Sequence, residues 1–256
     1  MTAGNEPDAA ALPRPGLGAL TLAVAQGASL ATFGGLVAAS TRRRGAALAG
    51  AAVTAAAVAP YVAAVARHQP YATGAQGLVR WAVDSTWSAP NTLSGALFFL
   101  HQRGRGNDIR HERTLGSGTL DLSRAAIAGY ATTVGVVVAG SRPRLDAHEQ
   151  VHVTQQRVLG PFYGPLVVVD YARLICVPTW WRRHDHDGAP IVSPSTYLQR
   201  GVYRRVWHER WAYAIAPAGS PVLTVRQTVR PVLRRLRRGS RAEGTGTEWA
   251  QQDSNL

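Results

Sequence analysis

The chain has 256 residues, enough for one large domain or two small ones, and its 46% apolar content is sufficient for a buried core. Its formal charge is +13, but every basic residue is Arg and none is Lys. The exclusive use of Arg is typical of a coding bias. The sequence also lacks the pattern of interleaved basic and aromatic residues that is typical of nucleic-acid binding, so a nucleic-acid partner is not expected. The single cysteine, Cys176, excludes an internal disulfide framework.

The N-terminal third is dominated by two long uncharged stretches. Residues 1–15 are polar and contain Pro, and we expect them to be disordered. Residues 16–41 and 45–66 carry no charge, each is long enough to cross a bilayer, and Arg42–Arg44 separate them. Their many Ala and Gly residues allow two helices to approach closely. We predict a transmembrane helical hairpin over 16–66; the alternative is a soluble, Ala-rich hairpin packed on the rest of the protein.

The next segments predict a short apolar helix and a small β element. Ser88–Leu100 is apolar but too short to span a membrane alone, which favours a re-entrant, surface-lying or buried helix. Asp108–Leu122 reads as a β-hairpin that turns at Gly116–Gly118. Thr132–Ala139 is rich in β-branched residues and predicts one buried strand. By analogy, the edge of such a strand could hold an extended substrate.

The stretch from Ser141 to Pro161 predicts a helix that carries chemistry. Ser141 can cap its start, Pro143 suits the first turn, and Gly160 followed by Pro161 is a stop signal. We therefore expect the whole stretch to be one helix with a single buried side.

This helix contains His148-Glu149-Gln150-Val151-His152, an H-E-x-x-H motif. Positions four apart share a helix face, so His148 and His152 can direct their imidazoles at one zinc ion. Glu149 lies beside them, where a carboxylate can take a proton from a zinc-activated water. The alternative is a solvated helix that matches the motif by chance.

A second apolar segment follows, Gly160–Trp181, with Asp170 and Arg173 three positions apart and expected to pair. The segment either packs behind the metal helix or forms a third membrane pass. The loop at 182–188 contains two His and two Asp, which suggests either a solvated loop or a metal site.

A catalytic zinc usually has three protein ligands, so the third must come from elsewhere in the chain. The candidates are Glu209, His208, Asp170 and the His184/His186 loop. Glu209 is favoured because it lies on a second predicted helix, 195–214, close to Tyr213 at helical spacing. His208 points about 100° away from Glu209 on the helix surface.

The C-terminal part is basic. Residues 217–238 form an amphipathic, Arg-rich segment interrupted at Pro231, which could lie on an anionic membrane or be a solvated terminal helix. Residues 239–256 are polar, and we expect them to be disordered.

Taken together, these motifs resemble the HExxHxxQ zincin-like proteins, a family of largely uncharacterised predicted zinc metallopeptidases of gluzincin type. The matching elements are Trp87-Ser-Ala-Pro-Asn-Thr92, the H-E-x-x-H helix with its Gly-Pro stop, and Glu209-Arg-Trp-Ala-Tyr213. The chain departs from the family in an insertion around 182–195 and in Val206-Trp207-His208, where the family has an Asn-Pro-Phe pattern.

The resemblance covers roughly Trp87 to Ala214 and implies a role for each matching residue. It implies His148, His152 and Glu209 as zinc ligands and Glu149 as the catalytic base, with Gln155 near the site. Tyr213, His208 and Asp170 remain candidates for positions next to the metal or the substrate.

We therefore expect a mainly α protein with a small β element, a transmembrane hairpin followed by a zincin-like domain over 67–216. The expected location is the membrane, with more than one pass and with lipid as a partner. The expected function is a zinc-dependent hydrolase that cleaves a peptide. The alternatives are a zinc enzyme acting on a small non-peptide molecule, and a non-catalytic membrane protein that retains the fold.

Overall fold

The computed structural model describes residues 14–176, 193–194, 197–221 and 223–238, and in this part of the chain it is mainly helical with one three-stranded sheet. This confirms the predicted combination of helices with a small β element. The helices are α1 Leu17–Ala39, α2 Ala46–His68, α3 Ala75–Ser85, α4 Ala89–Gly104, α5 His111–Thr114, α6 Asp146–Leu159, α7 Tyr163–Cys176, α9 Trp207–Ile215 and α10 Val225–Arg238. The strands are β1 Leu120–Leu122, β2 Thr132–Val134 and β3 Val137–Ala139.

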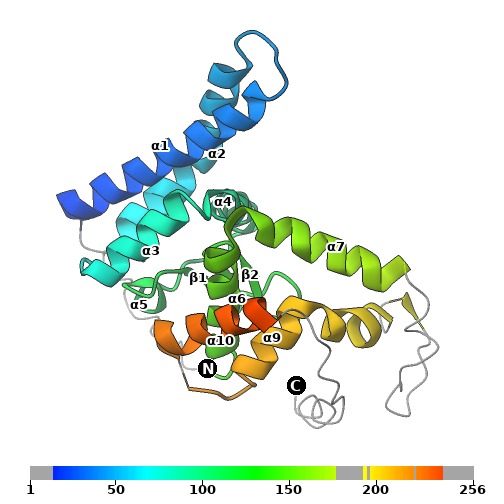
Figure 1. Cartoon of the computed structure of the whole chain (residues 1–256). Coiled ribbons are helices and arrows are strands. Elements are labelled where there is room, and N and C mark those ends of the chain that lie inside the picture. The colour runs from blue at the N-terminus through cyan, green and yellow to red at the C-terminus, as the bar shows by residue number, and fades with distance from the viewer. Residues whose placement is uncertain (1–13, 177–192, 195–196, 222, 239–256) are drawn as a thin grey trace, which may run out of the picture.

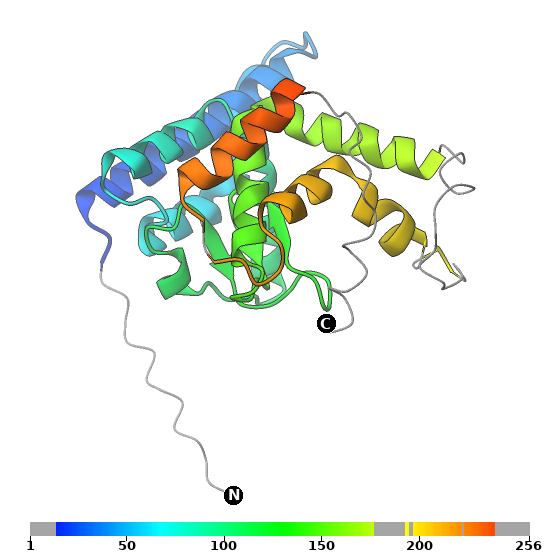
Figure 2. The same ribbon diagram turned by 60° about the horizontal axis from the view of Figure 1, so that its bottom comes forward.

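Helices α1 and α2 form the predicted hairpin, which projects from the rest of the protein with Arg42–Arg44 near its tip (Figures 1 and 2). Small residues let the two helices touch. A Cβ on Gly50 would lie 2.9 Å from the backbone oxygen of Gly34, and one on Gly35 would lie 2.9 Å from that of Ala47. Among the described residues, three helical stretches are long and apolar enough to cross a membrane, and α1 and α2 are two of them. These stretches indicate membrane association.

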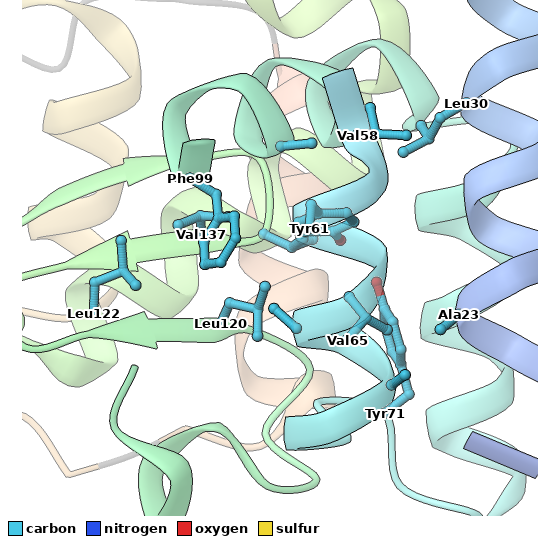
Figure 3. Packing of buried hydrophobic residues seen from close by; sticks show 14 of the residues in the cluster. Ala23, Leu30, Val58, Tyr61, Val65, Tyr71, Phe99, Leu120, Leu122 and Val137 are labelled. Carbon is cyan, nitrogen blue, oxygen red and sulfur yellow. The ribbon is translucent and has the colours of Figure 1, made fainter. Parts of the chain in front are cut away.

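The main hydrophobic core joins the hairpin to α4 and the sheet (Figure 3). Leu30 of α1 and Tyr61 of α2 are fully buried, and Phe99 of α4 packs edge-on against Tyr61 with ring centroids 6.2 Å apart. Leu120 and Val137 extend the same cluster onto β1 and β3. The part of the hairpin farther from Arg42–Arg44 therefore belongs to the globular core.

The sheet differs from the prediction in two places. Asp108–Leu122 is not a simple β-hairpin: its two ends form an antiparallel bridge between Ile109 and Leu122, but helix α5 lies between them and β1 pairs in parallel with β3. Thr132–Ala139 is not one strand but two, because Gly135 at φ +59° makes a tight turn that lets β2 pair antiparallel with β3. The strand order is β1-β3-β2, so β2 is the outer strand on the side of α6.

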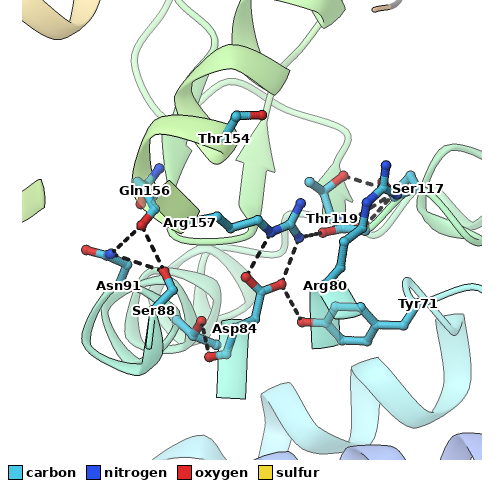
Figure 4. A network of polar contacts seen from close by, with 12 residues as sticks. Tyr71, Arg80, Asp84, Ser88, Asn91, Ser117, Thr119, Thr154, Gln156 and Arg157 are labelled. Atoms are coloured by element: carbon cyan, nitrogen blue, oxygen red, sulfur yellow. Dashed lines mark hydrogen bonds and ion pairs between the residues drawn. The ribbon is translucent and has the colours of Figure 1, made fainter. Parts of the chain in front are cut away.

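A chain of buried polar side chains links the hairpin to α6. The Gln26 amide of α1 donates to the Tyr71 hydroxyl at 2.9 Å, and that hydroxyl donates to Asp84 at 3.1 Å. Arg157 of α6 donates to both oxygens of Asp84, at 2.8 and 2.7 Å (Figure 4). Asp84 is fully buried. A buried carboxylate needs such partners, since an unpaired charge in the interior is very costly.

The segment around Trp87 caps the C-terminal end of α6, where backbone carbonyls lack partners within the helix. The Asn91 amide donates to the carbonyls of Gly160 and Gln156 at 2.7 and 3.2 Å, and the Ser88 hydroxyl donates to Gln156 O (Figure 4). The Trp87 indole donates to Val158 O at 3.2 Å. The Trp-x-x-Pro-Asn-Thr segment thus fixes the end of the helix that carries H-E-x-x-H.

The start of α6 lies later than the sequence predicts. The helix begins at Asp146, and Ser141 does not cap it; its hydroxyl instead donates to the Asp146 side chain at 2.6 Å. Arg113 also binds Asp146. These contacts hold residues 141–145 in an extended and turned conformation, so the helix begins only at Asp146.

Gly160 requires glycine for two reasons. Its φ is +54°, and an added Cβ would lie 2.3 Å from the Trp87 indole. We expect Gly160→Ala to destabilise the protein by about 2 kcal/mol or more, through strain and steric overlap. In the matched control, Gly164→Ala, the Cβ meets nothing within 4 Å inside α7. That change should be neutral or stabilising by up to about 1 kcal/mol. Thermal unfolding in detergent compares the two, and equal losses would contradict this account.

Candidate metal centre

Three buried side chains from two helices converge at one point. Helix α6 contributes His148 and His152, and α9 contributes Glu209, although 61 residues separate Glu209 from His148. The His148 and His152 Nε2 atoms are 3.1 Å apart, and Glu209 lies 3.3 Å from His148 and 3.5 Å from His152. Each of these side chains offers one ligand atom, and these atoms lie within 4.8 Å of one another, so the group could hold a metal ion.

The spacing of these atoms can be compared with tetrahedral coordination. At metal–ligand distances of about 2.0–2.1 Å, two corners of a tetrahedron lie about 3.3 Å apart. The Nε2–Nε2 separation of 3.1 Å is close to that value. The two Glu209 contacts are of similar length but involve different carboxylate oxygens, Oε2 toward His148 at 3.3 Å and Oε1 toward His152 at 3.5 Å. All three side chains are less than 10% exposed. The donors present therefore fit a small divalent cation in both chemistry and geometry.

Gln155 fixes the orientation of His152. Its amide nitrogen donates to the backbone carbonyl of His208 at 2.9 Å, so its oxygen faces His152 Nδ1 at 3.1 Å. An oxygen at that position accepts a hydrogen bond from Nδ1–H, which leaves a lone pair on Nε2, the atom directed at His148 and Glu209. Gln155 is fully buried and also joins α6 to α9.

Replacing Gln155 should weaken metal binding without removing a ligand. We expect Gln155→Ala to lower metal affinity about 10–100-fold, because His152 loses the acceptor that fixes its tautomer and ring plane. Competition with a chromophoric chelator measures the affinity. Gln150→Ala, on the same helix but outside this contact, should leave it unchanged. Equal affinities for Gln155→Ala and the wild type would exclude the positioning role.

Glu149 lies beside the three-residue group but does not belong to it. Its carboxylate accepts a hydrogen bond from the Thr133 hydroxyl of β2, and the side chain lines the same cavity as His152 and Glu209. This is the arrangement that the sequence predicts for a proton carrier next to a metal site.

The other candidates lie near the group in different roles. His208 lines the cavity, and burial lowers its pKa to about 4, which keeps its imidazole neutral. Tyr213 packs its ring against His148 with centroids 4.3 Å apart. Asp170 faces away from the group: it accepts from the Trp207 amide at 2.8 Å and pairs with Arg173 at 2.6 Å, which confirms the expected ion pair. The His184/His186 loop lies outside the described residues.

The electrostatics of Glu209 follow from its neighbours. Burial alone would raise the pKa of this carboxyl, but His152 and His148 outweigh burial and hold the pKa well below its usual range. Glu209 is therefore a carboxylate at neutral pH, which is the form that binds a cation.

A cavity of 430 Å³ opens beside the group. Sequence reasoning did not identify several of its residues: Tyr203, Tyr163, Tyr171, Ile127 and Leu198 give it a mainly apolar, aromatic wall. Burial raises the pKa of Tyr203, so its hydroxyl stays protonated. No local motif marks these side chains, because they come from three separate parts of the chain: Ile127, helix α7, and the two turns at 197–205.

Residues 197–215 are less regular than predicted. Instead of one helix over 195–214, they form a π-helical turn at Tyr197–Val202, a 3-10 turn at Tyr203–Arg205 and then α9. Ser195, the predicted cap, lies outside the described residues. The two turns place Leu198 and Tyr203 on the cavity wall.

The C-terminal helix α10 packs on α6 and α9, with Val232 fully buried against the cluster of Ala147, Val151 and Ala212. It therefore supports the two helices that carry His148, His152 and Glu209.

The chain matches no family model, no curated protein and no solved structure.

Proposed function

We propose that the protein is a membrane-anchored, zinc-dependent hydrolase related to the zincin-like metallopeptidases. One observation carries the proposal: one ligand atom from each of His148, His152 and Glu209 lies within 4.8 Å of the others, next to Glu149 on the wall of one cavity. Imidazole nitrogens with a carboxylate favour zinc over magnesium or calcium, which prefer oxygen ligands.

Each residue of the site has a separate role in the proposed hydrolysis. A cation held by His148, His152 and Glu209 would polarise the carbonyl under attack and lower the pKa of a water molecule. Glu149 accepts a proton at its carboxylate and passes it to the leaving group, and the Thr133 hydroxyl holds that carboxylate in place. Gln155 orients His152, and His208 stays neutral beside the cavity.

Two features of the cavity bear on the substrate. Strand β2 is an edge strand of the sheet, and Thr132 and Thr133 line the cavity, which suits an extended peptide lying along that edge. The aromatic wall suits an apolar side chain beside the bond to be cleaved. The same apolar wall also suits a small ester or amide, which is the second candidate substrate class.

The test is hydrolysis by the purified protein in detergent or proteoliposomes. A mixed peptide library, with small esters and amides as a second panel, is incubated with zinc-loaded protein and analysed by mass spectrometry. We expect cleavage that a chelator abolishes and added zinc restores. Zinc-loaded protein that cleaves neither panel would contradict the hydrolase and favour a non-catalytic membrane protein with a structural metal.

A further inference from the structure

The third stretch that is apolar enough to cross a membrane runs from Asp146 to Cys176, through α6 and α7. It is not a straight span, because the chain turns sharply at Gly160 and the two helices point in different directions (Figures 1 and 2). Helix α7 alone has 14 residues and is about 21 Å long, less than the roughly 30 Å of a hydrocarbon core. The described part of helix α7 is therefore shorter than the hydrocarbon core of a bilayer.

Helix α7 nevertheless exposes a wide apolar face. Asp170 and Leu174 are buried on its inner side, whereas Phe162, just before the helix, and Val168 and Val169 are 60–67% exposed. The remaining exposed large apolar side chains of this helix are Leu166 and Ile175. Its one basic residue, Arg173, is paired with Asp170. We call these five apolar residues the α7 outer face. Soluble monomers rarely expose such a contiguous patch.

The hairpin gives the depth of this region in a bilayer. The three charged side chains of Arg42–Arg44 have a high free-energy cost inside the hydrocarbon. A hairpin that enters the bilayer therefore places its tip at the far boundary. Ser29 precedes Arg42 by 13 residues, about 20 Å along a helix. In a core of about 30 Å, Ser29 then lies about 10 Å inside the near boundary.

A series of contacts relates the depth of Ser29 on α1 to the depth of the start of α7. The Ser29 hydroxyl donates to the backbone carbonyl of Ser85, at the end of α3. Two residues later, the half-exposed Trp87 packs against Phe162 with ring centroids 6.0 Å apart. The start of α7 is therefore at the level of the near leaflet, and Trp is a residue typical of that interfacial region.

We propose that α7 lies in the near leaflet of the bilayer that α1 and α2 cross, as an in-plane helix with the α7 outer face in lipid. The proposal does not depend on the hydrolase function. Its consequence for the site is that one helix separates lipid from the cavity, since Tyr163 and Tyr171 of the same helix line the cavity wall.

Site-specific fluorescence tests the proposal with full-length protein in vesicles of phosphatidylcholine and phosphatidylglycerol. In a Cys176→Ser background, an environment-sensitive label is attached to Val169→Cys. Val53→Cys, on the exposed side of α2, is the lipid control, and Glu112→Cys, on α5, is the aqueous control. We expect the Val169 label to be blue-shifted and quenched by lipids spin-labelled on the acyl chain, like the Val53 label.

Two outcomes overturn the proposal. Quenching of the Val169 label by aqueous iodide as strongly as the Glu112 label would place α7 in water. Protection from both quenchers would mean that protein, such as a second copy of the chain, covers the α7 outer face. Leu166→Cys repeats the measurement on the same face, so a single position that fails to fold does not decide the result. Metal content, measured on the same samples, separates this outcome from failure of the hydrolase proposal.

Discussion

Glu149→Gln should keep the metal and lose turnover by about 10²–10⁴-fold, the usual contribution of a positioned acid–base group. Glutamine has nearly the shape of glutamate and retains an oxygen that can accept the hydrogen bond from the Thr133 hydroxyl, so the local structure should persist. It has no carboxylate to accept a proton. The three metal-binding side chains stay in place, since Glu149 is not one of them.

Turnover and zinc content are measured on the same preparation, with any substrate that the panels identify. Glu112→Gln is the matched control, because Glu112 is exposed on α5, away from the cavity. That change should alter neither quantity. Unchanged turnover in Glu149→Gln would exclude Glu149 as the proton carrier, and loss of zinc would make it part of the ligand set.

Asp84→Ala should destabilise the protein by about 3–5 kcal/mol, because it leaves the buried guanidinium of Arg157 without its carboxylate. The same change removes the acceptor of the Tyr71 hydroxyl and so interrupts the polar chain between the hairpin and α6. Thermal or chemical unfolding in detergent measures the loss.

Asp108→Ala is the matched control, since Asp108 also pairs with an arginine, Arg103, but has a side chain that is 79% exposed. An exposed pair contributes about 0–1 kcal/mol, so this variant should be nearly as stable as the wild type. Equal losses for the two variants would mean that burial of the Asp84–Arg157 pair does not decide its contribution. A double variant with apolar residues at 84 and 157 should recover part of the stability.

The local part of the metal-binding group could be predicted from the sequence. His148 and His152 are four residues apart, and helical geometry alone puts them on one face. Their meeting with Glu209 depends on how α9 packs on α6, which no local pattern encodes. The candidates His208 and Glu209 are adjacent in the chain, and only the packing of α9 shows that Glu209 is the residue that joins the two histidines.

The errors in the sheet have a common physical cause. Thr132–Ala139 has the composition of a strand throughout, and the break comes from one glycine, Gly135, whose positive φ turns the chain. An Ala or Val there would have supported the predicted single strand. In Asp108–Leu122 the glycines suggest a hairpin turn, but four residues form α5, Ile109 forms an isolated antiparallel bridge to Leu122, and Leu120–Leu122 pairs in parallel with β3. Strand partners are set by tertiary packing, which local propensity does not predict.

The residues that hold α6 in position were also not predicted. Ser88 and Asn91 belong to the predicted apolar segment Ser88–Leu100 and Trp87 directly precedes it, yet all three bind backbone carbonyls near the end of α6. Asp84 and Arg157 are 73 residues apart. Such partners are visible only when the two segments lie side by side.

The most direct test of the metal centre is elemental analysis of the full-length protein, purified without chelators. We expect about one zinc per chain in the wild type and in His101→Ala, whose imidazole is exposed on α4, and almost none in His148→Ala or Glu209→Ala. A wild-type protein that contains no zinc and takes none up, or a His148→Ala variant with as much zinc as the wild type, would contradict the metal centre and the hydrolase that rests on it.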